Sequence, residues 1–560
     1  MDVTQSFAAT FVDELAAQGV EFACISPGSR SAPIAIALQR HPKIRVFVHI
    51  DERSGSFFGL GLAKATGKPV ILLSTSGTAA AEFHAAVVEA SHSRTPLIVL
   101  TADRPPELRD VGANQSIDQQ RLYGTAVRWF FDPGPPVELA NAPRLWRRLA
   151  VRTWAEAATG PVHINLPFRE PLVPTPGEVP TALGESGQTV SAGRTMPTPS
   201  QVTTLASALQ RAQRPLIVVG EMRDGDRLAP ALSRLGVPVL AEPSSQLRRA
   251  ETGAAVESYE ALLRAGWSLQ HGPDLVVRLG GTPTSKVLSA WLAATSAPTF
   301  LIDPDRAWRD QDQVANQVIA CDPQGLMEAL PAMDRSAWRD EWLSAGKRAT
   351  AAIAATFVST PIHEGHIVRA LASRIPDNAQ VFVGSSMPIR AADSFWPHAK
   401  TQQRFFGNRG ASGIDGLVST GLGLAAGRSS IPTVLLLGDL SLYHDMNGLW
   451  AMRRHGLKAT IVVCDNNGGG VFSFLPQAQH QDVFEELFAT PLGLDFAQVA
   501  RLYDLVYSPV TDRSGLEPAI ADAVAAQTPT MVVVKFKRED SVNGHRICWE
   551  AAAAALRCAG

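Results

Sequence analysis

The chain has 560 residues, of which 45% are hydrophobic and 19% are charged, and its net charge at pH 7 is −2. This length exceeds what one hydrophobic core organises, so about two to four domains are expected. The near-neutral charge provides no global field for nucleic acid, and no stretch has the roughly 18 apolar residues that a membrane span requires. We therefore expect neither a nucleic-acid partner nor a membrane partner.

The cysteines and the first residues indicate the compartment. The five cysteines show no pair at metal-ligand spacing, which favours free thiols in a reducing environment (Cys24, Cys321, Cys464, Cys548 and Cys558). Residues 1–5 have neither the basic start nor the apolar core of a signal peptide. These features predict a cytoplasmic protein.

The first 170 residues alternate helical and strand-like segments. Apolar side chains at helical spacing or small residues predict helices over residues 6–18, 54–65 and 79–91. Short apolar runs predict strands at residues 44–50, 70–73 and 97–100. This alternation is typical of a parallel sheet covered by helices. A stretch rich in Pro, Gly, Ser and Thr over residues 171–200 then predicts a linker.

Two further α/β units follow the linker. Strands of the second unit are predicted at residues 215–220, 237–240, 275–280 and 299–303, and no GxGxxG follows the first of them, which argues against a dinucleotide site. The third unit begins near residue 361, has predicted strands at residues 380–383, 433–437, 460–464 and 530–535, and ends in an alanine-rich helix over residues 550–558. We predict an α/β fold of three consecutive doubly wound parallel-sheet domains, over residues 1–180, 181–350 and 351–560.

Polar and glycine residues follow two predicted strands of the third unit. Gly438, Asp439, Leu440 and Ser441 come after the strand at 433–437, and Asn-Asn-Gly-Gly-Gly at 466–470 comes after the strand at 460–464. Ligands of open α/β sheets bind beyond the carboxyl ends of such strands. Asp and Asn oxygens suit Mg²⁺, which usually bridges to a phosphate, and glycines let the backbone approach that phosphate. The segments predict a metal–phosphate site, and two ordinary strand-to-loop turns are the alternative.

The pattern resembles the thiamine diphosphate motif, GDG followed by NN, with Leu440 in place of the last glycine and Asp465 where relatives often have Asn. The resemblance implies thiamine diphosphate and Mg²⁺ (or Mn²⁺) as cofactors, with the metal held by Asp439, Asn466 and the Gly468 carbonyl. It further implies a set of residues that contact thiamine diphosphate: Gly438, Leu440, Ser441, Ile414, Val471 and Phe472. For the last three, plain core packing is an alternative role that does not exclude the first.

Thiamine diphosphate enzymes also use a glutamate that hydrogen-bonds the aminopyrimidine ring and favours its imino tautomer. Glu52 matches this role because it follows the strand at 44–50 and precedes a helix. Burial against the cofactor would raise its pKa and suit proton sharing, whereas simple stabilisation of the helix N-terminus is the alternative. The resemblance implies that the glutamate of one subunit meets the diphosphate site of another, hence a homodimer or a dimer of dimers.

Longer segments restrict the resemblance to one family of thiamine diphosphate enzymes. This family has segments similar to five of this chain: residues 24–33 (CISPGSRSAP), 101–108 (TADRPPEL), 112–115 (GANQ), 160–167 (GPVHINLP) and 407–416 (GNRGASGIDG). It is the 2-succinyl-5-enolpyruvyl-6-hydroxy-3-cyclohexene-1-carboxylate (SEPHCHC) synthase family, whose members decarboxylate 2-oxoglutarate and add the succinyl carbanion equivalent to isochorismate in menaquinone biosynthesis. The resemblance is weaker across the middle unit.

Both implied substrates are dicarboxylates, so the site needs several cations, ideally arginines. Arginines lie in loops after predicted strands, and Lys286 follows the strand at 275–280, giving a cationic set of Arg30, Arg104, Arg390, Arg409 and Lys286. Ser29 and Gln115 would add neutral hydrogen bonds. By resemblance, Ser386 lies beside the reacting centre, and Glu52, Ser386 and Arg409 carry the catalytic roles.

Three other functions compete with this interpretation. Another thiamine diphosphate carboligase or decarboxylase, such as an acetolactate synthase, would act on small 2-oxoacids and need fewer arginines. A non-catalytic protein of the same fold would not need to keep Glu52 and Asp439, and both are present. A Rossmann oxidoreductase is disfavoured by the missing glycine fingerprint.

Overall fold

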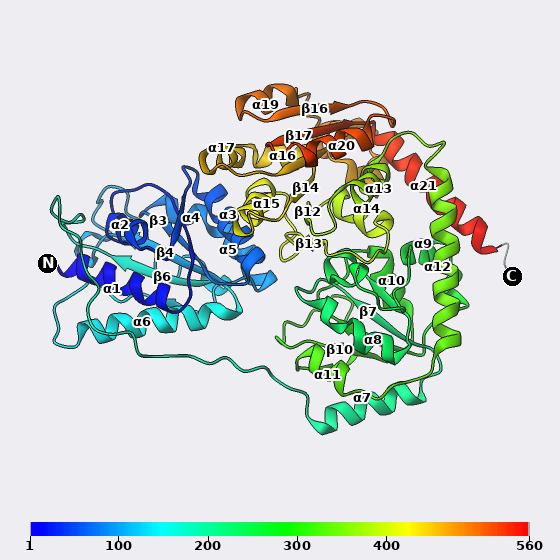
Figure 1. Cartoon of the computed structure of the whole chain (residues 1–560), viewed down its shortest axis with the longest axis horizontal. Helices are drawn as coiled ribbons and strands as arrows, with labels where there is room; N and C mark the ends of the chain where they lie inside the picture. Colours follow the sequence, from blue (N-terminus) through cyan, green and yellow to red (C-terminus); the bar gives the residue numbers. More distant parts are fainter. Residues whose placement is uncertain (1, 558–560) are drawn as a thin grey trace.

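Three parallel β-sheets, each with helices packed on it, organise the protein, whose computed structural model describes residues 2–557 (Figure 1). The central strands are buried on both faces: in the strand β3, Val70 and Leu72 pack into one hydrophobic cluster, whereas Ile71 and Leu73 pack into another. Such runs without polar alternation are expected where helices cover both sides of a parallel sheet. The predicted α/β fold with three doubly wound sheets is confirmed.

The first unit contains a six-stranded sheet, and most of its predicted elements are present. The predicted helix over residues 79–91 is interrupted, because the Ala80 carbonyl accepts a hydrogen bond from the Tyr123 hydroxyl and the chain forms two helices that meet at Phe83. The strands are β1 (Phe22–Ile25), β2 (Arg45–Val48), β3 (Val70–Ser74), β4 (Leu97–Asp103), β5 (Phe130–Phe131) and β6 (Val162–Pro167). The helices are α1 (Val3–Ala17), α2 (Ala32–Arg40), α3 (Glu52–Thr66), α4 (Thr78–Glu82), α5 (His84–Ser93) and α6 (Ala142–Glu156).

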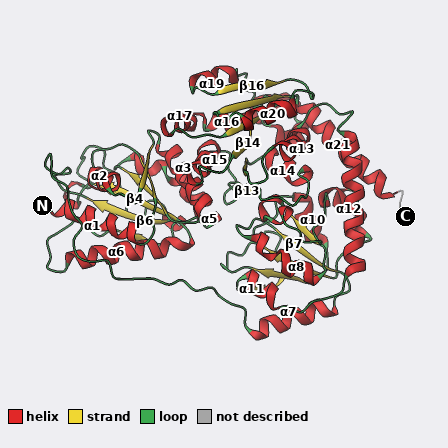
Figure 2. Ribbon diagram, viewed as in Figure 1, coloured by secondary structure: helices red, strands yellow, loops and turns green. Residues whose placement is uncertain are grey.

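A long connection leads to the middle unit. No helix longer than a turn and no strand occurs between β6 and α7, so the linker predicted over residues 171–200 is extended chain that runs along the molecule, drawn green in Figure 2. The middle sheet comprises β7 (Pro215–Val219), β8 (Val239–Ala241), β9 (Leu275–Leu279), β10 (Thr299–Ile302) and an unpredicted strand, β11 (Ala315–Ile319). Its main helices are α7 (Pro199–Arg211), α8 (Ala229–Leu235), α9 (Tyr259–Arg264), α10 (Lys286–Ala294), α11 (Pro323–Ala329) and α12 (Ser336–Thr356).

The third unit again contains six strands, β12 (Gln380–Val383), β13 (Arg404–Phe406), β14 (Thr433–Gly438), β15 (Thr460–Asp465), β16 (Val506–Val510) and β17 (Thr530–Lys535). Its main helices are α13 (Glu364–Arg374), α14 (Met387–Phe395), α15 (Leu417–Gly427), α16 (Asp439–His444), α17 (Trp450–His455), α19 (Phe496–Leu502), α20 (Leu516–Ala525) and α21 (Arg538–Arg557). The predicted alanine-rich helix is the end of α21, and Cys558 lies outside the described residues. The boundaries at residues 180 and 350 stay a prediction. Within residues 2–557, no helix has the length and apolar character to cross a membrane.

The first and third sheets have the same topology. Their strand orders are β2-β1-β3-β4-β6-β5 and β13-β12-β14-β15-β17-β16, and every strand pair is parallel. In both, neighbouring connections diverge around the first strand, which is the kind of switch point where ligands bind in open α/β sheets. The loops after β2 and β13 therefore occupy equivalent places in their two units.

Helices α3 and α15 pack the first unit against the third through glycines (Figure 1). A Cβ atom added to Gly61 would lie 2.0 Å from the Thr420 carbonyl oxygen, and one added to Gly423 would lie 2.1 Å from the Phe58 carbonyl oxygen. Only hydrogen at these positions allows the two backbones to approach so closely.

We expect Gly61→Ala to destabilise the protein, because the added methyl group meets backbone atoms that cannot rotate away. The overpacking should cost about 1–3 kcal/mol or more, which outweighs the roughly 1 kcal/mol by which alanine is the better helix former. Thermal unfolding measures the effect. Gly187→Ala is the matched control, since nothing lies within 4 Å of its added Cβ; equal melting temperatures for the two variants would contradict the close packing.

Candidate active site

The ends of β14 and β15 bring the predicted metal ligands together. Asp439 is 2% exposed; its Oδ2 accepts the Gly468 amide at 2.6 Å and its Oδ1 accepts the Leu440 amide at 2.8 Å. Burial raises the pKa of Asp439 to about 7. Asn466 is buried as well, and its Oδ1 has no hydrogen-bond partner among the described residues.

This donor set fits a divalent cation. A buried carboxylate and a buried amide oxygen without a partner are costly unless something compensates them, and a hard cation with oxygen ligands does so. Asp465 is half-buried beside them, and burial raises its pKa also. The backbone of Gly468 has φ +136°, and a Cβ there would lie 2.2 Å from the Ala489 carbonyl oxygen, so glycine is required at this turn.

Most of the residues predicted to line thiamine diphosphate lie next to these ligands in the chain, and Ile414 lies before α15. A Cβ added to Gly438 would meet only the Ser441 hydroxyl, at 3.8 Å, which leaves room for a ligand to approach the backbone. Ser441 is buried and Leu440 is half-buried. Val471 and Phe472 are half-buried in a short 3₁₀ helix, and Ile414 is half-buried and packs on the hydrophobic cluster between the first and third units. Packing and cofactor contact therefore remain compatible roles for Ile414.

A second group of predicted residues assembles in the first unit. Arg104 donates to the Ser76 hydroxyl at 2.6 Å, and the Gln115 amide donates to the Ser76 carbonyl at 3.0 Å. Arg30 donates to the Phe168 carbonyl at 2.9 Å, and burial together with the neighbouring Arg104 lowers its pKa. Ser29, beside Arg30, is exposed. Arg30 also lies 3.3 Å from the exposed Glu170 carboxylate, and its guanidinium group and that of Arg104 suit an anionic ligand at this edge of the sheet.

A third group lies in the third unit, after β12 and β13. Arg390 donates to the Ser386 carbonyl at 2.6 Å, and burial and the neighbouring Arg409 lower the pKa of Arg390. Ser386 has φ +73° and ψ −132°, and Gln115 has φ +55°. Non-glycine residues in such conformations are strained and are frequent at functional sites. Arg390 and Arg409 thus follow β12 and β13 of the third sheet, whereas Arg30 and Arg104 follow β1 and β4 of the first.

Glu52 is the first residue of α3. Its side chain is half-buried, and burial raises its pKa, helped by the neighbouring charges of Asp51 and Glu82. Asp51 caps the helix, because its Oδ1 accepts the Ser54 amide at 3.0 Å. The cap therefore does not require the carboxylate of Glu52, which stays available for another partner.

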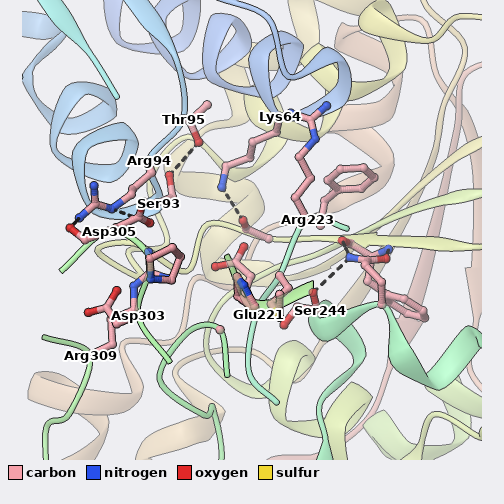
Figure 3. Close-up of a pocket in the computed structure, with 18 of the residues that line it drawn as sticks. Lys64, Ser93, Arg94, Thr95, Glu221, Arg223, Ser244, Asp303, Asp305 and Arg309 are labelled. Atoms are coloured by element: carbon pink, nitrogen blue, oxygen red, sulfur yellow. Dashed lines mark hydrogen bonds and ion pairs between the residues drawn. The ribbon is translucent and has the colours of Figure 1, made fainter. Parts of the chain in front are cut away.

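The predicted residues form separate groups in one chain. Among residues 2–557, no hydrogen bond or ion pair joins Glu52, Arg30, Arg104 or Gln115 to the predicted residues of the third unit. Lys286, the first residue of α10, is exposed and makes no such contact with the other predicted residues. A pocket where the three units meet is lined by Lys64, Arg94, Glu221 and other residues but by none of the predicted ones (Figure 3).

A buried cluster of His363, Glu364 and His545 offers metal-ligand atoms within 4.8 Å of one another. However, Nδ1 of His363 accepts the Gly365 amide at 3.1 Å. In the neutral ring Nε2 then carries the hydrogen and acts as a donor rather than as a ligand. Glu364 Oε2 accepts a hydrogen bond from the Ser541 hydroxyl, whereas Glu364 Oε1 and the Nε2 atoms of His363 and His545 have no hydrogen-bond partner among residues 2–557. The donor role of His363 Nε2 argues against a metal centre with these three ligands.

Comparison with known proteins identifies the family. Residues 5–122 match the N-terminal TPP binding domain of thiamine pyrophosphate enzymes, residues 193–383 their middle domain and residues 386–534 their C-terminal TPP binding domain. The 2-succinyl-5-enolpyruvyl-6-hydroxy-3-cyclohexene-1-carboxylate synthase of Geobacillus kaustophilus is 42% identical over 98% of both chains. The chain belongs to the SEPHCHC synthase family. Proteins of the same name from Chloroflexus aurantiacus (42% identical, 99% of this chain and 97% of the relative) and Haloquadratum walsbyi (39%, 97% and 96%) agree. These names do not support the acetolactate synthase-like alternative.

Two residues that contact the predicted groups were not predicted from the sequence. Ser76 accepts hydrogen bonds from both Arg104 and Gln115, and Glu89 holds the backbone around Arg409. Ser76 carries a recognisable signal, since the Ser-Thr-Ser-Gly run at 74–77 follows a buried strand. Glu89 carries none, because it lies within α5 and its partners are far away in sequence.

We expect Asp439→Asn to weaken metal-dependent cofactor binding, because the substitution removes the ligand charge but keeps the side-chain shape. The loss should at least equal the roughly 10–100-fold that replacing an outer-shell partner of a metal ligand costs. Titration of thiamine diphosphate at several Mg²⁺ concentrations, followed by tryptophan fluorescence, measures it. Addition of a chelator to the wild type should reproduce the defect; unchanged, chelator-insensitive binding would exclude Asp439 as a ligand.

Proposed function

We propose that the chain catalyses the decarboxylation of 2-oxoglutarate and the 1,4-addition of the resulting succinyl carbanion equivalent to isochorismate, which gives SEPHCHC and CO₂ in menaquinone biosynthesis. The relatives at 39–42% identity, which are SEPHCHC synthases by name, support this reaction. We also propose a cytoplasmic enzyme, in keeping with the described cysteines, which are all free thiols.

One observation of the structure supports dicarboxylates as the substrates. Arg30 and Arg104 are neighbours in the first unit, and Arg390 and Arg409 are neighbours in the third. Neighbouring guanidinium groups repel each other, the exposed Glu170 carboxylate compensates only Arg30, and guanidinium suits bidentate binding of carboxylates. A small monocarboxylate such as pyruvate does not need two such pairs, whereas two dicarboxylates do.

The remaining residues take roles around the cofactor. Asp439, Asn466 and the Gly468 carbonyl would hold Mg²⁺ or Mn²⁺ beside the diphosphate. Thiamine diphosphate, when bound, supplies the nucleophilic carbon and the electron sink for decarboxylation. Glu52 would share a proton with the aminopyrimidine ring, and its raised pKa suits that exchange. Ser386 and Arg409 would lie against the reacting atoms, while Ser29, Gln115 and Lys286 would add hydrogen bonds to the substrates.

We further propose a homodimer in which the groups combine across subunits. The first-unit group of one chain, with Glu52, would meet the third-unit group of the other chain, with Asp439. The lack of hydrogen bonds between the two groups within the described part of one chain supports this proposal. A dimer of dimers would leave the same site unchanged.

We expect Glu52→Gln to lower kcat by several orders of magnitude while thiamine diphosphate still binds. The amide keeps the size of the side chain but cannot take up a proton from the aminopyrimidine ring. Steady-state assays give kcat, and fluorescence titration gives the cofactor affinity. Unchanged turnover would remove Glu52 from the mechanism.

For Arg409→Ala we expect a loss of kcat/KM with the cofactor affinity preserved, because Arg409 is assigned to substrate rather than to diphosphate. Removing a charge-assisted hydrogen bond to a carboxylate costs about 1.5–3 kcal/mol, or roughly 10–150-fold. Weaker cofactor binding without a change in substrate use would reassign this arginine.

CO₂ release from 2-oxoglutarate, measured with and without isochorismate, tests the function as a whole. Release that isochorismate accelerates, with the succinyl adduct detected by mass spectrometry, is the expected result. Release without an adduct would leave a 2-oxoacid decarboxylase. No release from 2-oxoglutarate would refute the proposal.

A further inference from the structure

We propose that Glu89, assisted by Lys64, is a positioning residue for Arg409. The inference rests on the proposed function, because it concerns how the residue assigned to substrate is held. Glu89 lies in α5 and Lys64 in α3, both in the first unit, whereas Arg409 lies in the loop after β13 of the third unit.

The Glu89 carboxylate binds the backbone of the loop directly after Arg409. Its carboxylate accepts the amides of Gly410 at 2.9 Å, Ala411 at 2.6 Å and Ser412 at 3.3 Å. The side chain is 2% exposed, so water does not compete for these donors. Three successive amides that converge on one carboxylate form an anion-binding turn, and charge-assisted bonds of this kind are stronger than neutral ones.

Lys64 holds the other side of Arg409. Its ammonium donates to the Gly407 carbonyl at 2.9 Å and lies 3.6 Å from the Glu89 carboxylate. The pair therefore compensates its own buried charges and, at the same time, fixes the residues before and after Arg409. Removing one partner of a buried pair is costly because it leaves the other charge unpaired.

Close packing on α5 leaves the loop at residues 407–412 little room to adopt another conformation. A Cβ added to Gly410 would lie 2.5 Å from the backbone carbonyl oxygen of Glu89 and 2.8 Å from the Ser93 amide nitrogen, so the loop backbone lies directly on α5. Ser412 has φ +62°, a strained conformation that needs external support.

The same loop is connected to the neighbouring arginine. The Asn408 carbonyl accepts the Ser385 hydroxyl at 3.4 Å, and Ser385 precedes Ser386, whose carbonyl binds Arg390. Glu221 also lies near Lys64, Glu89 and Arg409, and burial raises its pKa. Displacing the loop should therefore disturb the spacing of Arg409 and Arg390, which two bound carboxylates would require.

The test compares Glu89→Gln with Glu517→Gln, a matched control whose side chain forms an exposed ion pair with Arg374. In Glu89→Gln we expect the amides of residues 410–412 to exchange hydrogen faster. We also expect kcat/KM to fall on the order of 10–100-fold, since a misplacement of 1 Å can cost roughly 100-fold. Cofactor affinity should stay within about twofold, and the control should match the wild type in every measurement.

A double-mutant cycle separates positioning from general support of the fold. If Glu89 acts through Arg409, then Glu89→Gln should cost much less in an Arg409→Lys background than in the wild type. Equal losses in both backgrounds, or a Glu89→Gln enzyme with wild-type kcat/KM, would overturn the inference. Should Glu89→Gln fail to fold, Lys64→Met tests the same loop from the Gly407 side with the same readouts.

The outcomes also distinguish this inference from the proposed function. A wild type without activity on 2-oxoglutarate and isochorismate would refute the function, and hydrogen exchange at residues 410–412 would then decide alone whether Glu89 holds the loop. An active wild type with a strong Arg409→Ala defect but unchanged exchange in Glu89→Gln would refute only the positioning role.

Discussion

The close approach of α3 and α15 is the constraint on which the rest of the structure depends. With Gly61 and Gly423 at the contact, each backbone packs directly on the other, and no flexible side chain lies between them that could adjust. The orientation of the first unit relative to the third is therefore determined by backbone geometry. Glu52 lies at the beginning of α3, and the loop with Arg409 and Ile414 leads into α15. The contact between the two helices therefore determines where Glu52 and this loop lie relative to each other.

The common topology of the two outer sheets explains how the chemistry is divided. Ser29 and Arg30 follow the first strand of their sheet, as Ser386 and Arg390 follow the first strand of theirs, and Glu52 and Arg409 each follow the second. Both sheets thus present an arginine after the first strand, whereas the second arginine of each pair lies elsewhere, Arg104 after β4 and Arg409 after β13. Only the third sheet adds Asp439 and Asn466 after its next two strands, whereas β3 is followed by the turn that contains Ser76. One unit therefore suits a metal and diphosphate, and the other suits a proton-sharing carboxylate.

The fold was predictable from the sequence where a signal was local. The buried strands β3, β14, β15 and β17 are continuous apolar runs, and the motif around Asp439 follows one of them. Short strands such as β13, with three residues, carry too little periodicity to be recognised. Ser76 and Glu89 were missed because their partners are distant in sequence, and only the packed units bring them together. Motif resemblance could name Arg409 as a site residue, but it could not indicate what holds the residue in place.

The contacts between the outer units are reciprocal. The first unit holds the Arg409 loop through Glu89, and the third unit holds the first turn of α3. Ser54 donates to Asp445 and to Asn447, both at 3.1 Å, and Asn447 donates to Asp51, the residue before Glu52. Asp445 also accepts the Ser419 amide at 2.7 Å, at the start of α15. The segment that begins with Asp439 thus ends on the turn that carries Glu52. Because each unit orients a functional group of the other, a shift at the glycine contact would displace Glu52 and Arg409 together, and correct docking of the two units becomes a condition for both.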